Sequence, residues 1–452
     1  MATSLRLRVP KDVASVLDRV TAAGFEAFVV GGCVRDAIRG IEPKDWDIAT
    51  SALPDDVQRI FPRSLYTNRF GTVIVRVAGH EIQVTTYRVE ADYGDRRRPD
   101  AVAFTGDLTR DLSRRDFTMN AMAWRPAGEG QLVDPFGGRS DLERRLIRAV
   151  GDPDERFSED ALRMLRAVRF ATVLGFEIEG ATAAAIARNA DLARYLSGER
   201  IQQELVRILE VPRPSGAFRL MDELGLLAVI CPELEECKRI PQDKAVAQDV
   251  LEHSLITLDA TPPGDLVLRL AGLLHDIGKP ETFAGGHFHQ HEFVGEAKAR
   301  TILRRWKFPR QTVDQVAHLV RHHMFWYQPD WNGSAVRRFV RKVGLEVIPA
   351  LFALRRADNI GSGARSPRMY ALEDLWQRVQ EEIAHATAFS KRDLAIDGHD
   401  VMRELAVPQG PEVGRIMDAL FERVTDDPEL NDRETLLRLG RDIMARERAG
   451  GS

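Results

Sequence analysis

Two aspartates separated by one residue, Asp45 and Asp47, are the side chains in this sequence that most directly suggest chemistry. On a strand, alternate side chains share a face, so both carboxylates would project from the same side. Two adjacent carboxylates repel each other unless a cation lies between them, and hard oxygen ligands with room for phosphates suit Mg²⁺. The pair therefore predicts a metal site, although the pattern by itself also fits a solvated strand edge.

A strand, a tight turn and a short helix are expected just before this pair. Residues 27–30 are apolar and β-prone, which predicts a buried strand. Gly31 and Gly32 would let the backbone turn tightly and approach a ligand closely, and residues 34–39 can form the helix. A diphosphate-sized group could then lie on the two glycine amides at the start of that helix.

The glycine pair and the aspartate pair, with Arg35 and Asp36 between them, resemble the signature of class II tRNA nucleotidyltransferases and bacterial poly(A) polymerases, which belong to the polymerase-β-like superfamily. The resemblance implies an α+β fold: an N-terminal nucleotidyltransferase head made of a small mixed sheet with helices, followed by an all-α neck, an HD-containing body and a tail. It also implies that Asp45 and Asp47 are catalytic and hold Mg²⁺, and that Gly31, Gly32 and Arg35 bind the nucleotide.

A third metal ligand in the head stays open. Residues 72–77 and 81–88 alternate like two strands joined by a turn. Members of the resembled family often carry a third acidic residue in the second of these strands, but the matching position here is the amide Gln83. Glu81 could reach the metal ions instead, or the two aspartates could suffice.

Residues 112–123, LSRRDFTMNAMA, place a dense cluster of charged side chains beside an apolar run. This pattern indicates an ordered network of charged groups and not a set of solvated surface side chains. The same residues would also fit the capped start of a helix. The stretch matches the RRDFTxNA motif of the resembled family. The match implies that Asp116 and Asn120 order the head and contact the sugar or phosphates of the nucleotide.

Residues 152–170, DPDERFSEDALRMLRAVRF, form a second informative stretch. Ser158 can cap a helix that runs on through Asp160 and Arg163, and these two side chains would then share a face. The stretch is longer than a surface ion pair needs. It resembles the EDxxR motif of the family, whose Asp and Arg bond the base of the incoming nucleotide, and the continuation of the match implies that Arg166 and Arg169 also bind the nucleotide.

An Asp–Arg pair can select bases without a nucleic-acid template. Cytosine and adenine each present an amino donor beside a ring-nitrogen acceptor, while a carboxylate only accepts and a guanidinium only donates. Guanine and uracil place a carbonyl opposite the carboxylate, where the amino group should be. Asp160 and Arg163 would therefore favour CTP and ATP as substrates.

The middle of the chain carries a separate pattern of histidines and aspartates around the doublet of His275 and Asp276. The pattern resembles the HD superfamily of metal-dependent phosphohydrolases. That resemblance implies one or two transition-metal ions (Mn, Ni, Co or Fe) that activate a water molecule at neutral pH. The ligands would be His253, His275, Asp276, His291, His322, His323 and Asp358. Such a domain either hydrolyses phosphoesters or serves as helical scaffold.

The composition narrows the class of protein. The chain has 452 residues, a net charge of −4 and a hydrophobic content of 44%. Its three cysteines lack the paired spacing of a zinc site or a disulfide framework, which fits a reducing cytoplasm. No apolar run approaches the ~20 residues that span a membrane. The charge argues against a broadly basic nucleic-acid coat but allows local basic patches.

The family resemblance covers essentially the whole chain. The expected domains are a catalytic head at 1–145, a helical neck for base recognition and RNA binding at 146–235, an HD-containing body at 236–388 and a helical tRNA-binding tail at 389–452. In the body, Trp326, Tyr327 and Trp331 could meet RNA, but core packing is the simpler explanation. Candidate RNA contacts are Arg96, Arg97, Arg98, Lys391, Arg392 and Arg415.

The expected function is template-independent addition of CMP and AMP to the 3′ end of tRNA, which builds or repairs the CCA end from CTP and ATP and releases pyrophosphate. Two alternatives stay open. One is an enzyme of the same scaffold that adds only A, to a CC end or as a poly(A) tail. The other is a phosphohydrolase whose head only grips RNA. The expected partners are tRNA, ATP and CTP, with no membrane.

Overall fold

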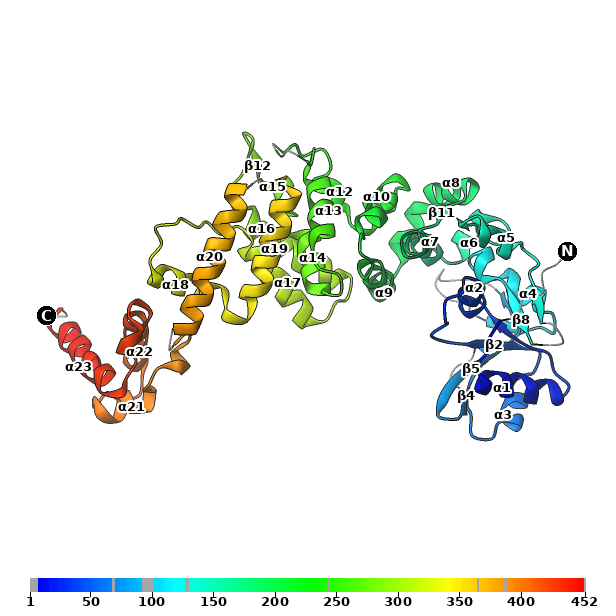
Figure 1. The fold of residues 1–452 in the computed structure, drawn as a ribbon, viewed down its shortest axis with the longest axis horizontal. Helices are drawn as coiled ribbons and strands as arrows, with labels where there is room; N and C mark the ends of the chain where they lie inside the picture. The colour runs from blue at the N-terminus through cyan, green and yellow to red at the C-terminus, as the bar shows by residue number, and fades with distance from the viewer. Residues whose placement is uncertain are drawn as a thin grey trace. The chain divides into compact units, whose positions relative to one another are not determined.

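The computed structural model describes residues 7–66, 70–91, 101–126, 130–242, 244, 246–363, 366–385 and 388–450 (Figure 1). The chain divides into two compact units. Residues 1–235 with 305–307 form the first unit, and residues 236–304 with 308–452 form the second. Within the described ranges, no helix is both long and apolar enough to cross a membrane. The finer division into four domains stays a prediction.

A mixed sheet in the strand order β3-β4-β5-β2-β1-β8-β9 lies in the first unit. Its strands are β1 (Ala27–Val30), β2 (Asp47–Thr50), β3 (Leu65–Tyr66), β4 (Thr72–Val77), β5 (His80–Thr86), β8 (Ala123–Arg125) and β9 (Gln131–Val133). β1 runs antiparallel to β2 and β8, whereas β2 runs parallel to β5. β6 (Arg88–Ala91) pairs separately with β7 (Ala101–Phe104). The expected α+β class with a mixed sheet in the head is confirmed.

Short helices surround this sheet: α1 (Lys11–Ala22), α2 (Gly32–Ile38), α3 (Pro54–Ile60), α4 (Leu108–Ser113) and α5 (Gly138–Glu143). α1 is amphipathic because Val13, Val16 and Val20 recur at the spacing of one helical face, where they are buried. α2 follows β1 through Gly31, whose φ is 79°. The positive φ favours glycine, and a Cβ at this position would lie 2.7 Å from Nη1 of Arg115, so the arginine side chain would have to move to admit one.

Two local expectations are wrong. β2 begins at Asp47, so Asp45 lies in the loop before the strand and not on the strand. The single helix expected through Arg163 is two helices, α6 (Pro153–Glu159) and α7 (Leu162–Leu174), because Asp160 between them is extended with φ −146°. Oδ1 of Asp160 accepts a hydrogen bond from the backbone N–H of Leu162 at 3.0 Å, and such side-chain bonds compete with a continuous helix.

Helices complete the first unit after the sheet. They include α8 (Gly180–Asn189), α9 (Gly198–Leu209), α10 (Ser215–Glu223) and α11 (Leu226–Ile230). α7 packs against α9, and α10 packs against α7. The contact between α7 and α9 brings together charged side chains that are far apart in the sequence.

The second unit is almost entirely helical, as expected. Its helices include α13 (Val250–Ala260), α14 (Leu266–Leu274), α15 (Lys279–Thr282), α16 (His291–Arg305), α17 (Arg310–His322), α18 (Gly333–Val343), α19 (Ile348–Gly361) and α20 (Ser366–His385), and the boundary with the first unit falls within α12 (Pro232–Cys237). α13 packs on both α14 and α19, and α14 packs on α17. α21 (Gly398–Glu404), α22 (Pro411–Asp426) and α23 (Arg433–Gly450) form a separate core that includes Val401, Ile416, Leu420 and Leu436.

Candidate active sites

An open cavity of about 960 Å³ in the first unit collects every residue predicted to bind a metal ion or a nucleotide there. The cavity is lined by the glycine turn that follows β1 and by residues of the helices α7 and α9. The predicted residues that line it are Gly31, Gly32, Arg35, Asp45, Asp47, Asp116, Asn120, Asp160, Arg163, Arg166 and Arg169.

Both aspartates of the pair face this cavity, and both are exposed residues. The walls of the cavity displace water from Asp47, and this raises the pKa of its carboxyl group; the Arg115 charge opposes the rise and the Asp45 charge adds to it. Two neighbouring carboxylates that remain accessible in one cavity form a donor set suited to a hard divalent cation.

The third metal ligand stays a prediction, but strand register shows which residue lies beside Asp47. Gln83 on β5 lies directly beside Asp47 on β2 and lines a small cavity with it. Glu81 is exposed, and its carboxylate accepts hydrogen bonds from Arg76 on the neighbouring strand at 2.7 and 2.9 Å. The amide therefore occupies the position nearest to Asp47, while Glu81 is engaged elsewhere.

Asp116 is the centre of a buried hydrogen-bond network. Its Oδ2 accepts from Nε and Nη2 of Arg166 at 2.8 and 2.6 Å, and its Oδ1 accepts from Asn120 at 3.1 Å. Burial alone would raise the pKa of Asp116, but the Arg166 charge and these hydrogen bonds outweigh it and lower the pKa to about 2. Arg35 joins the network, because its Nη1 donates to Oδ1 of Asn120 at 2.8 Å.

The side chains of the two proposed base-reading residues are held by different partners. Oδ2 of Asp160 accepts from Nη2 of Arg200 on α9 at 2.7 Å. The buried Arg163 donates to Glu159 at 2.7 Å and to the backbone carbonyls of Arg156 and Arg114 at 3.2 and 3.0 Å. Each side chain is therefore held by its own partners while it lines the cavity, and this fixes its orientation before a nucleotide arrives.

Two residues on α9 were missed as individual contacts by sequence reasoning. Arg200 holds Asp160, and the buried Glu204 accepts a hydrogen bond from Nε of Arg169 at 2.5 Å. Their spacing of four residues places both on one face of α9, and this spacing was the available signal. Their partners on the other side of the cavity could not be read from the sequence, because each contact joins residues at least 35 positions apart.

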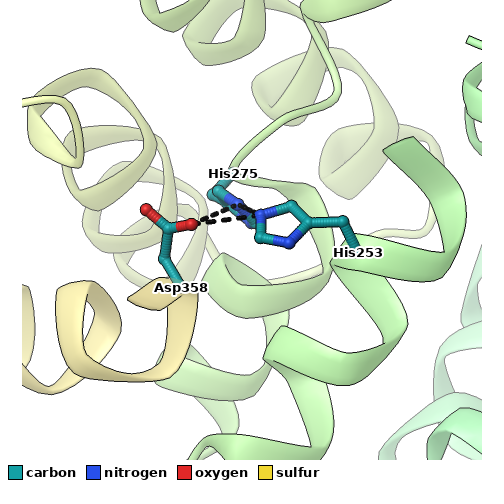
Figure 2. A group of neighbouring side chains, drawn as sticks. All are labelled: His253, His275 and Asp358. Carbon is teal, nitrogen blue, oxygen red and sulfur yellow. Dashed lines mark hydrogen bonds and ion pairs between the residues drawn. The ribbon is translucent and has the colours of Figure 1, made fainter. Parts of the chain in front are cut away.

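Two groups of buried side chains in the second unit have the composition of metal sites. The first is His253, His275 and Asp358, and the second is Asp276, His291 and His323. Figure 2 shows the first group, in which side chains from α13, the end of α14 and α19 point toward one another. Nε2 of His253 lies 3.1 Å from both Nε2 of His275 and Oδ1 of Asp358.

The carboxylate of Asp276 connects the two groups. Its Oδ2 lies 3.4 and 3.3 Å from Nε2 of His253 and His275, and its Oδ1 lies 3.3 and 3.5 Å from Nε2 of His291 and His323. One carboxylate that faces two groups of ligands is suited to bridge two metal ions.

Hydrogen bonds that the imidazoles donate to backbone carbonyls orient three of the rings. Nδ1 of His275, His291 and His323 lies 2.9, 2.9 and 2.7 Å from the carbonyl oxygens of residues 272, 288 and 320. An Nδ1–H bonded to a carbonyl leaves the Nε2 lone pair free to face the centre, which is the arrangement that metal-binding histidines use. The residues present therefore fit a centre of two transition-metal ions.

His322, which was also predicted as a ligand, lies outside both groups. Its ring packs on His318, with 4.5 Å between the ring centroids, while the adjacent His323 enters the centre. Successive residues at the end of a helix point in different directions, so only one of the two neighbouring histidines reaches the centre.

Three cationic side chains adjoin the metal groups. Nζ of Lys279 donates to Oδ2 of Asp276 at 2.6 Å, and Nη1 of Arg355 donates to Oδ2 of Asp358 at 2.7 Å. Nζ of Lys244 lies 2.7 Å from Nε2 of His253, and removal from water lowers the pKa of this lysine to about 8. The cations balance the two carboxylates and make the cavity above the centre attractive to an anion.

The predicted RNA contacts are dispersed. Arg96, Arg97 and Arg98 lie outside the described residues. Lys391, Arg392 and Arg415 are exposed in the part of the chain that precedes and includes α22, and Lys391 forms an ion pair with Asp418. The predicted roles of these residues stay predictions.

Comparison with protein families gives three matches along the chain. Residues 27–148 match the poly(A) polymerase head domain, residues 175–238 match an RNA- and SrmB-binding site of polymerase A, and residues 290–439 match domain 2 of tRNA nucleotidyltransferases. The first match contains the glycine turn, both aspartates and Asp116.

Similar proteins and structures match nearly the whole chain. A CCA-adding enzyme from Geobacillus stearothermophilus is 32% identical over 94% of this chain and 95% of its own length. A second, from Geobacillus sp. strain WCH70, is 35% identical over 93% of each chain. The crystal structure of the Bacillus stearothermophilus CCA-adding enzyme in complex with CTP superposes with a TM-score of 0.73 at 30% identity, over 98% of this chain and 99% of that one.

Proposed function

The chain belongs to the family of CCA-adding enzymes, and we propose that the cavity of Asp45 and Asp47 is where it adds CMP and AMP to the 3′ end of tRNA. The reaction uses CTP and ATP and builds the CCA end. The observation that carries the assignment of the site is the cavity itself, which collects the glycine turn, the aspartate pair and the Asp160–Arg163 stretch from separate parts of the sequence.

The chemical step is a phosphoryl transfer. The 3′-hydroxyl of tRNA attacks the α-phosphorus, the bond from that phosphorus to the bridging oxygen breaks, pyrophosphate leaves, and the hydroxyl proton passes to solvent. Asp45 and Asp47 would hold Mg²⁺, which when bound supplies positive charge to the attacking and leaving oxygens. The amides of Gly31 and Gly32, beside the Arg115 guanidinium, would receive the phosphates of the nucleotide.

We infer that Asp160 and Arg163 select CTP and ATP among the four nucleotides. The carboxylate of Asp160 would accept a hydrogen bond from the exocyclic amino group, and the guanidinium of Arg163 would donate to the ring nitrogen. Arg200 and Glu159 support the proposal because they restrain these two side chains from behind. Because these side chains are already restrained, they lose little conformational entropy when the base binds. The restraint also prevents them from rotating to match the edge of the wrong base.

The test is extension of tRNA with single labelled nucleotides. Transcripts that lack CCA, or that end in C or CC, are each incubated with one of the four nucleotides. We expect CTP to extend the first two transcripts and ATP to extend only the CC end. An enzyme that adds only A would leave the first two transcripts unchanged with CTP, and this outcome would contradict the assignment.

We propose a phosphohydrolase as a second activity, at the six clustered ligands of the second unit. Two ions of Mn²⁺, Ni²⁺, Co²⁺ or Fe²⁺ when bound would polarise water and the phosphate oxygens. The preset imidazole tautomers and the bridging position of Asp276 support this function over a scaffold, because scaffolding needs neither. The test is hydrolysis of phosphate esters after loading with each metal, and a metal-loaded protein without hydrolysis would favour the scaffold.

RNA binding by the tail and the place of action are part of the same proposal. Lys391, Arg392 and Arg415 are exposed cations that would bind tRNA phosphates, and Arg96, Arg97 and Arg98 are proposed to bind them as well.

The free thiols of Cys33, Cys231 and Cys237 fit a reducing compartment, and we propose the cytoplasm as the place of action.

A further inference from the structure

Trp326 is the most exposed of the large hydrophobic side chains that the structure describes, with 77% of its surface accessible. It lies in an irregular segment directly after His323, in which exposed and partly buried residues alternate from Met324 to Tyr327. Phe325 points into the core, where its ring centroid lies 5.1 Å from that of Phe339 and 5.6 Å from that of Phe352. Met324 and Trp326, on either side of this anchored ring, are both exposed and therefore face outward.

Packing does not explain this tryptophan. The expectation that core packing accounts for it is wrong for Trp326, although Tyr327 and Trp331 are partly buried. Leaving a large indole in water forgoes the stabilisation that its burial would supply. A rigidly anchored, exposed aromatic side chain is instead typical of a surface that binds a ligand.

Trp326 lies on a wall that two cavities share. One cavity, of about 670 Å³, opens over the metal centre and is lined by Lys244, Lys279 and Arg355. The second, of about 380 Å³, is lined by Arg321 and Lys342 with further aromatic side chains. Met324, Phe325 and Trp326 line both cavities. An exposed indole is therefore flanked on both sides by cations.

This alternation of cations and an aromatic face fits a single strand of nucleic acid. Phosphates bind the cations, and a base stacks on an indole whichever base it is. Cations on both sides of Trp326 match phosphates on both sides of one stacked base, which a mononucleotide does not have. The guanidinium of Arg321 lies 3.0 Å from the ring centroid of Phe293 and pairs with Glu296 at 3.6 Å, which fixes its position, and Lys342 adds a second cation to this cavity.

We propose that this wall binds a single-stranded RNA end, with a base stacked on Trp326, the preceding phosphate beside Arg321 and Lys342, and the terminal phosphate ester at the metal centre. The proposal rests on the phosphohydrolase proposed above. In the reaction, water adds to the phosphorus, the bond between phosphorus and the sugar oxygen breaks, and that oxygen takes a proton and leaves as a hydroxyl. The substrate class is thus a 3′-terminal phosphate on a strand and not a free nucleotide.

The test compares three phosphate esters on the full chain loaded with Mn²⁺: an RNA hexamer with a 3′-phosphate, a 3′-mononucleotide and glycerol 2-phosphate. We expect kcat/KM to fall in that order. Trp326→Ala should lower the ratio of hexamer to glycerol phosphate by about 10-fold, as expected for the loss of one stacked base. Tyr370→Ala is the matched control, because Tyr370 is 73% exposed and lines neither cavity, and it should leave the ratio unchanged.

Crosslinking separates failure of this proposal from failure of the phosphohydrolase. A hexamer that carries 4-thiouridine is irradiated with the protein, and the crosslinked peptides are identified by mass spectrometry. Crosslinks in residues 324–331 that disappear in Trp326→Ala support the surface even if no ester is hydrolysed. Crosslinks confined to the first unit, or a substrate ratio that Trp326→Ala does not change, would overturn the proposal.

Discussion

In the first unit, Asp45 and Asp47 are exposed at the wall of an open cavity, whereas in the second unit His253, His275 and Asp276 have at most 2% of their surface accessible. The first arrangement supplies few protein ligands and leaves the remaining positions for phosphates and an RNA end. The second supplies six ligands with preset imidazoles before any substrate arrives. Metal binding should therefore depend on substrate in the first unit and on the protein alone in the second.

The strongest test of this contrast is Asp47→Ala. Loss of one of two carboxylates should abolish CMP and AMP addition, because so few other protein ligands are present. The protein should keep its fold, since Asp47 is exposed. The measurement is extension of tRNA that lacks CCA, with retained metal content in the second unit as the control. Normal turnover of the variant would mean that Asp47 is not a metal ligand.

Asp276→Asn tests whether the ligands of the second unit bind metal ions by themselves. Because Asp276 faces both ligand groups, the change should remove bound transition metal from both, and any phosphohydrolase activity with it. Metal content per chain is measured by mass spectrometry after dialysis. His322→Ala is the matched control, since His322 lies outside both groups, and it should keep the metal.

Nucleotide addition should survive Asp276→Asn, because the residues of the first cavity come from the other unit. A folded Asp276→Asn protein that no longer extends tRNA would show that the two centres are coupled.

Asp160→Asn should change which nucleotide is added. The amide keeps the shape of the side chain but can present an N–H donor where the base of C or A also donates, while U and G offer an acceptor. Misincorporation of U or G relative to C and A should rise by about one to two orders of magnitude, as expected for 1–3 kcal/mol per lost contact. Single-nucleotide kinetics measure the ratio.

Asp152→Asn is the control for this change, because Asp152 caps the same helix α6 and does not line the cavity. An equal fall for all four nucleotides in Asp160→Asn would show that Asp160 only holds Arg200.

The Asp116–Arg166 pair should stabilise the first unit in a pH-dependent way. The folded pKa of Asp116, about 2, is below the ~3.9 of an unfolded aspartate, so the pair contributes fully above about pH 4 and less as pH falls toward 2. This difference in pKa corresponds to roughly 2–3 kcal/mol of stability. Asp116→Asn should lack this part of the acid dependence, as measured by hydrogen exchange in α7 peptides between pH 5 and 2. Identical acid profiles would show that the pair adds no stability.

The parts of the molecule that sequence predicted well are local in the chain. The turn at Gly31, the two aspartates and the doublet of His275 and Asp276 can be recognised from neighbouring residue types. The structure places the turn and the aspartates at one cavity and the doublet in the buried ligand groups. The break at Asp160 was not foreseen, because one side-chain bond to the amide of Leu162 decided it against helix periodicity.

The sequence also could not predict the contacts between residues far apart in the chain or the exposure of individual side chains. The pairing of Asp160 with Arg200 joins two helices 40 residues apart, and periodicity within either helix carries no information about the other. Adjacent histidines at 322 and 323 could not be separated, because their roles depend on how α17 ends. The outward direction of Trp326 depends on the anchor of Phe325 against α18 and α19.

The smallest expected effect, and the finest test of how few ligands the first cavity supplies, concerns Gln83. Its amide lies beside Asp47 but carries no charge, so Gln83→Ala should lower nucleotide addition by no more than about 10-fold, the value of one hydrogen bond. Gln83→Glu would place a third carboxylate beside Asp47 and should lower the Mg²⁺ concentration needed for half-maximal rate. Glu81→Gln, the control on the same strand, should change neither quantity, because Glu81 bonds Arg76. If Glu81→Gln were as damaging as Asp47→Ala, Glu81 would be the third ligand, and the first cavity would hold its metal ions with more protein ligands than this comparison allows.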